Sequence, residues 1–247
     1  MSIFMYTKGT FKEVIAMLSQ LDQNTMKERA ARQAADTVWN GARLGVGTGS
    51  TVKFFIDALG ERKAAGLQLG AVVTTSSRSK AQLEGLGFTV SELADVEQLD
   101  LTVDGADRVD SHLDGIKGGG GALTLEKNVA VHSAHNTWIV DESKVVDHLG
   151  GFPLPVEVLP ISAKQVYNQF EDEGLLPQFR TTATGERYVT HYGNYIIDLY
   201  IDPLPAPRGL ATYLDSTVGV VEHGLFLGIC DTVIIAREDG TIDVKKR

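Results

Sequence analysis

The sequence of 247 residues predicts an α/β fold, in which a mostly parallel, Rossmann-like sheet is flanked by helices and joined to a second, smaller α+β lobe. Up to about residue 140, short apolar runs alternate with amphipathic stretches, and this alternation implies right-handed crossovers within a parallel sheet. The pattern changes at Gly150, because all seven prolines lie between Pro153 and Pro207 and strand-like runs outnumber helical ones there.

Hydrophobic periodicity, capping residues and glycines define the expected elements. Thr10 with Glu13 and Thr25 with Glu28 have the spacing of capping boxes that open the first two helices. The expected helices cover residues 10–22, 25–39, 52–59, 78–86 and 123–133. The strands expected in the larger sheet cover residues 43–46, 69–75, 88–90, 99–103 and 137–140, with 231–237 returning to that sheet. The smaller lobe is expected to contain a helix at 163–173 and strands at 156–159, 179–182, 188–190 and 195–201.

The chain therefore divides into three expected parts. Residues 1–24 form an N-terminal helical extension, residues 25–150 with 225–247 form the main α/β catalytic domain, and residues 151–224 form the small α+β lobe. No internal repeat or low-complexity segment interrupts this arrangement.

Composition excludes several classes of protein. A net charge of −9 with no basic cluster argues against a nucleic-acid-binding surface. No apolar run approaches the roughly 20 residues that span a bilayer, so no membrane partner is expected. Lys8 and Lys12 interrupt the N-terminal apolar residues, which argues against a signal peptide and favours a cytoplasmic protein. Cys230 stands alone, so no intramolecular disulfide forms, and its apolar neighbours predict a buried, inert thiol.

The segment from residue 104 to 127 holds the chemistry. Asp104, Asp107 and Asp110 follow the strand expected at 99–103, at the edge where open α/β sheets bind ligands. Three carboxylates could bind Mg²⁺ or Mn²⁺, but Lys117 and Lys127 lie nearby in sequence and no histidine completes a ligand set. We expect no metal site, assign functional roles to Asp104 and Asp107, and place Asp110 in a solvated turn.

Four consecutive glycines follow Lys117. Each costs roughly 0.5–1 kcal/mol of backbone entropy relative to alanine, so a folded protein keeps them where main chain approaches a ligand or adopts positive φ. Glu126 falls in the first or second turn of the next helix; taken alone, it is explained by a favourable interaction with the helix dipole. Next to Lys117 and Asp104, it suggests a small anionic substrate that is held by main-chain N–H groups and transformed by carboxylates.

A second glycine-rich loop, Gly-Val-Gly-Thr-Gly-Ser-Thr at 45–51, lies between an expected strand and a helix. No Lys-Ser/Thr pair completes a Walker A motif, and the glycine spacing does not match a dinucleotide fingerprint. Exposed amides and hydroxyls at a helix N-terminus suit a phosphate or sugar hydroxyls; in the alternative, Ser50 or Thr51 merely caps the helix. Thr74–Ser77 ends the neighbouring strand on the same sheet edge, which favours a ligand.

The histidines give little signal. His132 and His135 lie near a helix end without a third ligand, which favours surface or capping roles. His223 could line a cleft between the lobes or cap a turn.

Five motifs together resemble ribose-5-phosphate isomerases of the A type. They are GVGTGST at 45–51, DGAD at 104–107, KGGGGALTLEK at 117–127, FPLPVEV at 152–158 and GVVEHGLF at 219–226. The resemblance covers about residues 26–240, in the same order. It implies an enzyme of the pentose phosphate pathway that interconverts D-ribose 5-phosphate and D-ribulose 5-phosphate without a metal or organic cofactor. It also implies a homodimer or homotetramer, with the small lobe as the expected contact.

The resemblance also implies roles for individual residues. Glu126 matches the general base that carries a proton between C2 and C1 through a cis-enediolate, and Lys117 matches the cation beside the developing oxyanion. Asp104, with Asp107 beside it, matches the acid that assists ring opening. The substrate-binding positions are Lys27, which reaches the phosphate, the loop Thr48, Gly49, Ser50 and Thr51, and the backbone cradle Gly118, Gly119, Gly120 and Gly121.

Two departures and two rival functions accompany this interpretation. Arg108 stands where the family often has Glu, and His191-Tyr192 stands where it commonly has Asp-Asn. A sugar-phosphate deaminase or lactonase would need a histidine for ring opening or hydrolysis, and residues 104–127 contain only one, His112, in the polar loop. A sugar-phosphate sensor usually carries a DNA-binding helix-turn-helix, for which the first two expected helices are too weakly basic.

Overall fold

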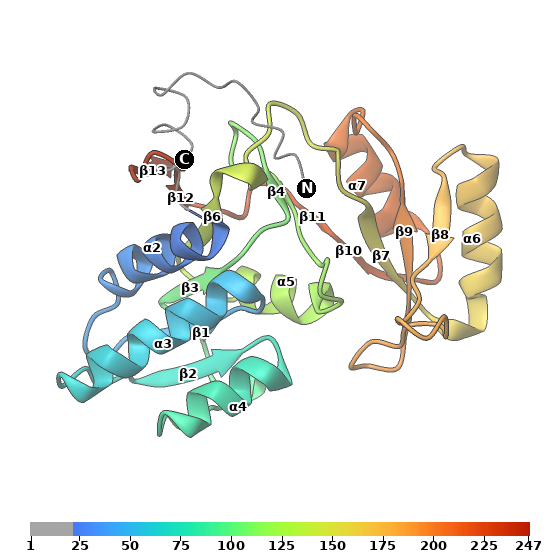
Figure 1. The fold of residues 1–247 in the computed structure, drawn as a ribbon. Helices are drawn as coiled ribbons and strands as arrows, with labels where there is room; N and C mark the ends of the chain where they lie inside the picture. The colour runs from blue at the N-terminus through green and yellow to red at the C-terminus, as the bar shows by residue number, and fades with distance from the viewer. Residues whose placement is uncertain (1–21) are drawn as a thin grey trace, which may run out of the picture.

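Two lobes lie side by side in the computed structural model, which describes residues 22–247 (Figure 1). The helix expected at 10–22 and nearly all of the expected extension 1–24 lie outside the described residues. Within the described part of the chain, no helix has the length and apolar character needed to cross a membrane.

The larger lobe is built on a six-stranded sheet with the order β13-β12-β6-β3-β1-β2. All neighbouring strands pair in parallel except β12 and β13, which are antiparallel. The mostly parallel sheet is therefore confirmed, as is the return of residues 231–237 to it. The strands are β1 (Arg43–Val46), β2 (Ala71–Thr74), β3 (Leu101–Asp104), β6 (Asn136–Asp141), β12 (Thr232–Ala236) and β13 (Ile242–Lys246).

Helices cover both faces of this sheet because its strands are apolar on both sides. In β6, Ile139 faces the core formed with α2 (Gln23–Ala35) and α3 (Ser50–Ala64), whereas Trp138 and Val140 face the opposite core. On that opposite side, Val129 of α5 (Leu123–Val131) packs against Val73 and Leu99. Helix α4 (Ser77–Gly85) lies beside α3 and β2. The short helix η1 (Leu93–Asp95) follows α4, and η2 (Glu142–Lys144) follows β6.

The smaller lobe contains an antiparallel sheet with the order β10-β7-β9-β8. Val156 and Val158 of β7 face a core shared with the two helices of this lobe, so the intervening Glu157 lies on the opposite face, toward α5. The elements are β7 (Leu154–Val158), η3 (Pro160–Ser162), α6 (Ala163–Asp172), β8 (Pro177–Phe179), β9 (Tyr195–Leu199), α7 (Pro207–Ser216) and β10 (Val220–His223).

A small third sheet joins the lobes. Its strands, in the order β11-β5-β4, are β4 (Arg108–Val109), β5 (Gly115–Ile116) and β11 (Leu225–Phe226), and all pairs are antiparallel. Lys117 directly follows β5, and its backbone N–H donates to Gly224 O at 2.9 Å. Gly224 N–H donates in turn to Pro155 O of β7, so this sheet fixes the segment after Lys117 against the small lobe.

Two expected strands do not form, and the strand expected at 179–182 is displaced to Pro177–Phe179, with only an isolated bridge at Thr181. Residues 88–90 form no strand: Phe88 is buried in the core, and Ser91 N–H donates to Val72 O, but no ladder develops. Residues 188–190 contribute only an isolated bridge, between Val189 and Tyr195.

Several helix ends also differ from the expected bounds. The helix expected at 25–39 begins instead at Gln23, where Asp22 rather than Thr25 is the cap. It ends at Ala35, whose carbonyl oxygen binds the Arg62 guanidinium, as does that of Val38. Helix α3 continues past Gly60 to Ala64. The elements not foreseen are α7, the strands β4, β5, β10, β11 and β13, and the short helices η1, η2 and η3.

Candidate active site

A cavity of about 590 Å³ lies where the parallel strands β1, β2 and β3 end and the small lobe approaches them. The expected site residues line it, with the exception of Asp104, whose carboxylate lies beneath and contacts Lys117. Those that line the cavity are Lys27, Thr48, Gly49, Ser50, Thr51, Asp107, Lys117, Gly118, Gly119, Gly120, Gly121 and Glu126. Segments distant in the sequence thus converge on one pocket.

Asp104 is the last residue of β3, and its carboxylate is saturated with donors. Oδ1 accepts backbone N–H groups from Thr48 at 3.0 Å and from Gly105 at 2.7 Å. Oδ2 accepts from Lys117 Nζ at 2.9 Å. Asp104 therefore joins the loop after β1 to the lysine after β5, and it orients both.

Gly47 is required for this arrangement, because a Cβ there would lie 1.8 Å from Asp104 Oδ1. We expect Gly47→Ala to lower the free energy of unfolding by about 1–3 kcal/mol, the cost of overpacking a filled site. Gly85 is the matched control, since a Cβ there meets no heavy atom within 4 Å. Gly85→Ala should gain up to about 1 kcal/mol. Urea unfolding measures both, and equal stabilities for the two variants would contradict the packing argument.

Lys117 and Glu126 form the buried centre of the site. Their side chains are 3% and 5% exposed, and Lys117 Nζ lies 3.8 Å from Glu126 Oε2. That oxygen accepts no hydrogen bond from the described residues. A buried carboxylate oxygen without a protein donor is costly, and its place in the cavity leaves it free to accept a hydrogen bond from a water or a bound ligand.

The electrostatics of this pair follow from burial. The pKa of Glu126 is raised to about 8, chiefly by burial; the Asp104 and Asp107 carboxylates contribute in the same direction, and the Lys117 ammonium opposes them. Burial alone would lower the pKa of Lys117, but the Asp104 and Glu126 carboxylates outweigh it and raise this pKa above its ordinary value. The site therefore holds a permanent cation beside a carboxyl group that exchanges protons near neutral pH.

The glycine loop after Lys117 has the geometry that its composition predicts. Gly118 and Gly121 have φ of +97° and +79°, and a Cβ on Gly121 would lie 2.4 Å from Tyr188 Oη. Gly119 N–H donates to Asp107 Oδ2 at 2.8 Å. Asp107 thus holds one end of the loop, with the backbone facing the cavity.

The loop after β1 supplies the polar end of the cavity. Gly49 is the N-cap of α3, with φ +112°, and no side chain caps that terminus, so neither Ser50 nor Thr51 acts as the cap. Thr48 Oγ1 donates to Ser76 Oγ at 3.0 Å. Besides Lys117, the cations that line the cavity are Lys27, Arg78, Lys80 and Lys144. Hydroxyls, an open helix N-terminus and cations together suit a phosphate group.

Sequence reasoning missed the wall contributed by the small lobe, namely Glu157, Tyr188 and Thr190, together with the cations Arg78, Lys80 and Lys144. Glu157 is 1% exposed and accepts from Thr124 Oγ1 of α5, from Thr190 Oγ1 at 2.7 Å and from Asn194 Nδ2 at 2.9 Å. A glutamate inside the apolar run FPLPVEV was the available signal. His191 and Tyr192, noted only as departures, also line the cavity.

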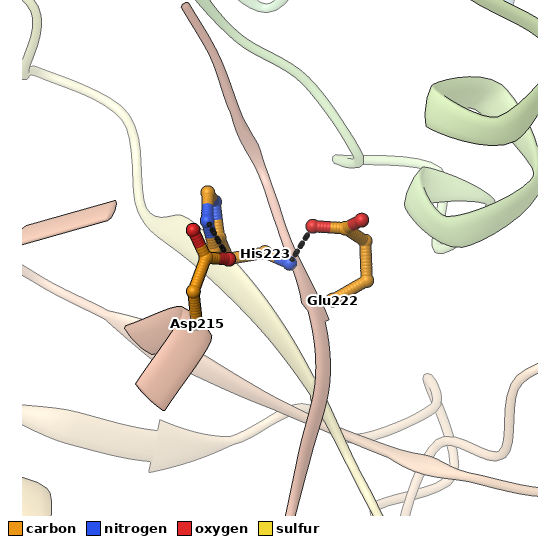
Figure 2. A group of neighbouring side chains, drawn as sticks. All are labelled: Asp215, Glu222 and His223. Carbon is orange, nitrogen blue, oxygen red and sulfur yellow. Dashed lines mark hydrogen bonds and ion pairs between the residues drawn. The ribbon is translucent and has the colours of Figure 1, made fainter. Parts of the chain in front are cut away.

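A second polar cluster lies on α7 and β10 and contains Asp215, Glu222 and His223 (Figure 2). Potential ligand atoms of the three lie within 4.8 Å of one another. However, the Lys127 ammonium binds Glu222 Oε1 and lies 3.4 Å from His223 Nδ1, and a second cation there would be repelled. His223 Nδ1 also accepts Leu225 N–H, so this histidine caps a turn within an ion-pair cluster that fastens α5 to the small lobe.

Comparison with known proteins agrees with this geometry. The family model for ribose 5-phosphate isomerase A (phosphoriboisomerase A) matches residues 71–240. The ribose-5-phosphate isomerase A of Lactobacillus delbrueckii subsp. bulgaricus is 69% identical over 230 residues, which cover 93% of this chain and 100% of that protein. The protein of the same name from Lactobacillus gasseri is 68% identical over 231 residues, with coverage of 93% and 100%.

Solved structures give the same result. A ribose 5-phosphate isomerase A from Neisseria gonorrhoeae superposes with a TM-score of 0.85 at 36% identity, covering 92% of this chain and 98% of that one. A D-ribose-5-phosphate isomerase in complex with phospho-erythronic acid superposes with a TM-score of 0.88 at 32% identity, covering 92% and 100%. The chain belongs to the ribose 5-phosphate isomerase A family.

Proposed function

We propose that this enzyme interconverts D-ribose 5-phosphate and D-ribulose 5-phosphate through a cis-enediolate, with Glu126 as general base and without a metal ion. The observation that carries the mechanism is the Glu126 carboxylate, which is buried in the cavity beside Lys117 and has one oxygen that accepts no hydrogen bond from residues 22–247. A base that is placed in this way can remove a proton from C2 of the open-chain aldose and return it to C1.

Lys117 has the complementary role. The proton removed by Glu126 is weakly acidic, so the rate depends on stabilising the negative charge that develops on the substrate oxygens. The Lys117 ammonium is preorganised by Asp104 Oδ2 and by the carbonyl of Gly105. Donors aimed at a developing oxyanion contribute about 3–4 kcal/mol each in comparable sites.

The donor set supports metal independence. Asp104 uses Oδ1 for two backbone N–H groups and Oδ2 for Lys117, and Asp107 Oδ2 accepts Gly119 N–H. A divalent cation would have to displace these donors next to a fixed ammonium, which is unfavourable. Asp107, which lines the cavity, instead suits the handling of hydroxyl protons during ring opening, while Asp104 orients Lys117 and the loop after β1 from beneath the cavity. We assign the substrate phosphate to the loop Thr48–Thr51 and the cations around it.

The test is formation of ribulose 5-phosphate from ribose 5-phosphate by purified enzyme in excess chelator. Turnover at ordinary enzyme rates supports both reaction class and metal independence. If the activity is lost in chelator and added Mg²⁺ or Mn²⁺ restores it, the metal-free mechanism is overturned. Absence of turnover with retained binding of ribose 5-phosphate would favour a sugar-phosphate sensor.

The pH dependence should report Glu126. A base acts in its ionised form, and burial raises the pKa of Glu126 to about 8, so kcat/KM should fall as pH decreases through about 8. The ordinary value of 4.5 would instead give a flat profile above about pH 6. Initial rates between about pH 5.5 and 9.5 distinguish the two, and a flat profile would show that Glu126 is not desolvated in the working enzyme.

A further inference from the structure

Arg180 connects the small lobe to the glycine loop of the active site. It lies just after β8, and its backbone N–H donates to Ile196 O of β9 at 2.9 Å, which fixes its place in the small sheet (Figure 1). Its Nη1 donates to Gly118 O at 2.9 Å and to Gly119 O at 3.1 Å. One side chain of the small lobe therefore binds two consecutive carbonyl oxygens of the loop.

The Arg180 side chain is itself fixed. Nε and Nη2 donate to the two carboxylate oxygens of Asp198 in β9, and the two side chains are only 14% and 10% exposed. A planar guanidinium that is held bidentately has one orientation available for its remaining N–H groups. The pair therefore sets the direction of the two carbonyls that it binds.

Because the peptide groups are planar, the contacts of Arg180 with two carbonyl oxygens also fix the directions of the N–H groups that follow them. In a trans peptide, the C=O of one residue and the N–H of the next point in opposite directions. Gly118 O points to Arg180, and Gly119 N–H accordingly points away from it, to Asp107 Oδ2 at 2.8 Å. Gly119 O also points to Arg180, so Gly120 N–H must point away from the guanidinium as well.

No described residue accepts a hydrogen bond from Gly120 N–H. Gly120 lines the cavity and is exposed there, and no hydrogen bond of the described residues uses its N–H. A Cβ at this position would meet no heavy atom within 4 Å, so no described side chain crowds Gly120. This N–H is available to a substrate oxygen.

We propose that Arg180, held by Asp198, is a positioning residue that fixes two peptide planes of the glycine loop so that Gly120 N–H donates to a substrate oxygen on which negative charge develops. The inference rests on the proposed isomerase function and deepens it, because it assigns to the small lobe a part in stabilising the enediolate. Arg180 does not touch the substrate; it acts through the main chain.

The experiment compares Arg180→Lys, Arg180→Ala and Asp198→Asn with the wild type for isomerisation of ribose 5-phosphate. Removal of one oxyanion donor typically lowers kcat by about 10²–10³-fold, so misorientation of one should lower kcat by roughly 10–100-fold and change KM much less. Guanidinium ion added to Arg180→Ala should restore part of kcat. Arg187→Lys is the matched control. The Arg187 side chain stacks on Phe179 and Tyr195, so this substitution should leave kcat unchanged.

A double-variant comparison separates positioning from general stabilisation. Gly120→Pro removes the N–H itself, so combining it with Arg180→Lys should lower kcat no further than the more damaging single change. Multiplied losses, or a wild-type kcat for folded Arg180→Lys, would overturn the inference. The inference would also be overturned if guanidinium ion cannot restore the lost kcat and the loss of kcat follows the unfolded fraction seen by circular dichroism. Absence of turnover in the wild type would instead reject the isomerase function.

Discussion

Glu126→Gln is expected to lower kcat by at least about 10²–10⁴-fold while the enzyme remains folded. Glutamine has the shape of glutamate but cannot accept the proton, and Oε2 accepts no hydrogen bond from the described residues that an amide would disrupt. The measurement is initial formation of ribulose 5-phosphate. Near-wild-type kcat would remove Glu126 from the role of base.

Stability provides the control for this variant. Because the pKa of Glu126 is raised from 4.5 to about 8, the unfolded chain is ionised between these values while the folded one holds the proton. The contribution of this group to the free energy of unfolding therefore falls as pH rises from about 4.5 to 8. Glutamine does not ionise, so Glu126→Gln removes this loss of stability. Urea unfolding at pH 8 should find Glu126→Gln at least as stable as wild type. The matched control, Glu61→Gln on the surface, should keep full kcat.

The second large effect is expected for Lys117→Met. The change leaves the Asp104 and Glu126 carboxylates in a buried site without their cation. Breaking one side of a buried ion pair costs about 3–5 kcal/mol, and loss of the oxyanion donor should lower kcat by about 10²–10³-fold. Urea unfolding and steady-state rates measure the two losses separately.

A double variant separates these two losses. Asp104→Asn added to Lys117→Met removes a buried charge, so it should recover part of the stability and none of the activity. Lys53→Met is the control, because its pair with Asp57 is exposed and contributes about 0–1 kcal/mol. A Lys117→Met enzyme as stable as wild type would contradict the buried network.

The sequence predicts the half of the site that depends on local chemistry. Asp104 ends a buried strand and Glu126 lies in the next helix, so their proximity follows from the geometry of an open α/β sheet, whereas Lys117 is placed by the unforeseen strand β5. Their catalytic roles stay predictions, as do the homo-oligomer and the cytoplasmic location.

The other half depends on how two sheets pack. Arg180 and Glu157 reach the site only because the small sheet faces α5, and no periodicity in sequence reports which residues meet across such a gap. The joining strands β4, β5 and β11 are two residues long, too short for an alternation signal. Helix α7 was missed because its Pro207 and Gly209 resemble loop residues, although proline is favourable at a first helical position.

The anchoring of α5 has a consequence for how the enzyme opens. Thr124 binds Glu157 of β7, and Lys127 binds Glu222 and the carbonyl of His223 in β10. Native-state opening proceeds in cooperative units set by such contacts rather than by chain order. The amide protons of α5 should therefore exchange together with those of β7 and β10, although α5 lies among the helices of the larger lobe in sequence. A fluctuation that loosens the small sheet would release the helix that carries the base. Amide exchange in α5 and loss of catalytic competence would therefore share one free energy of opening.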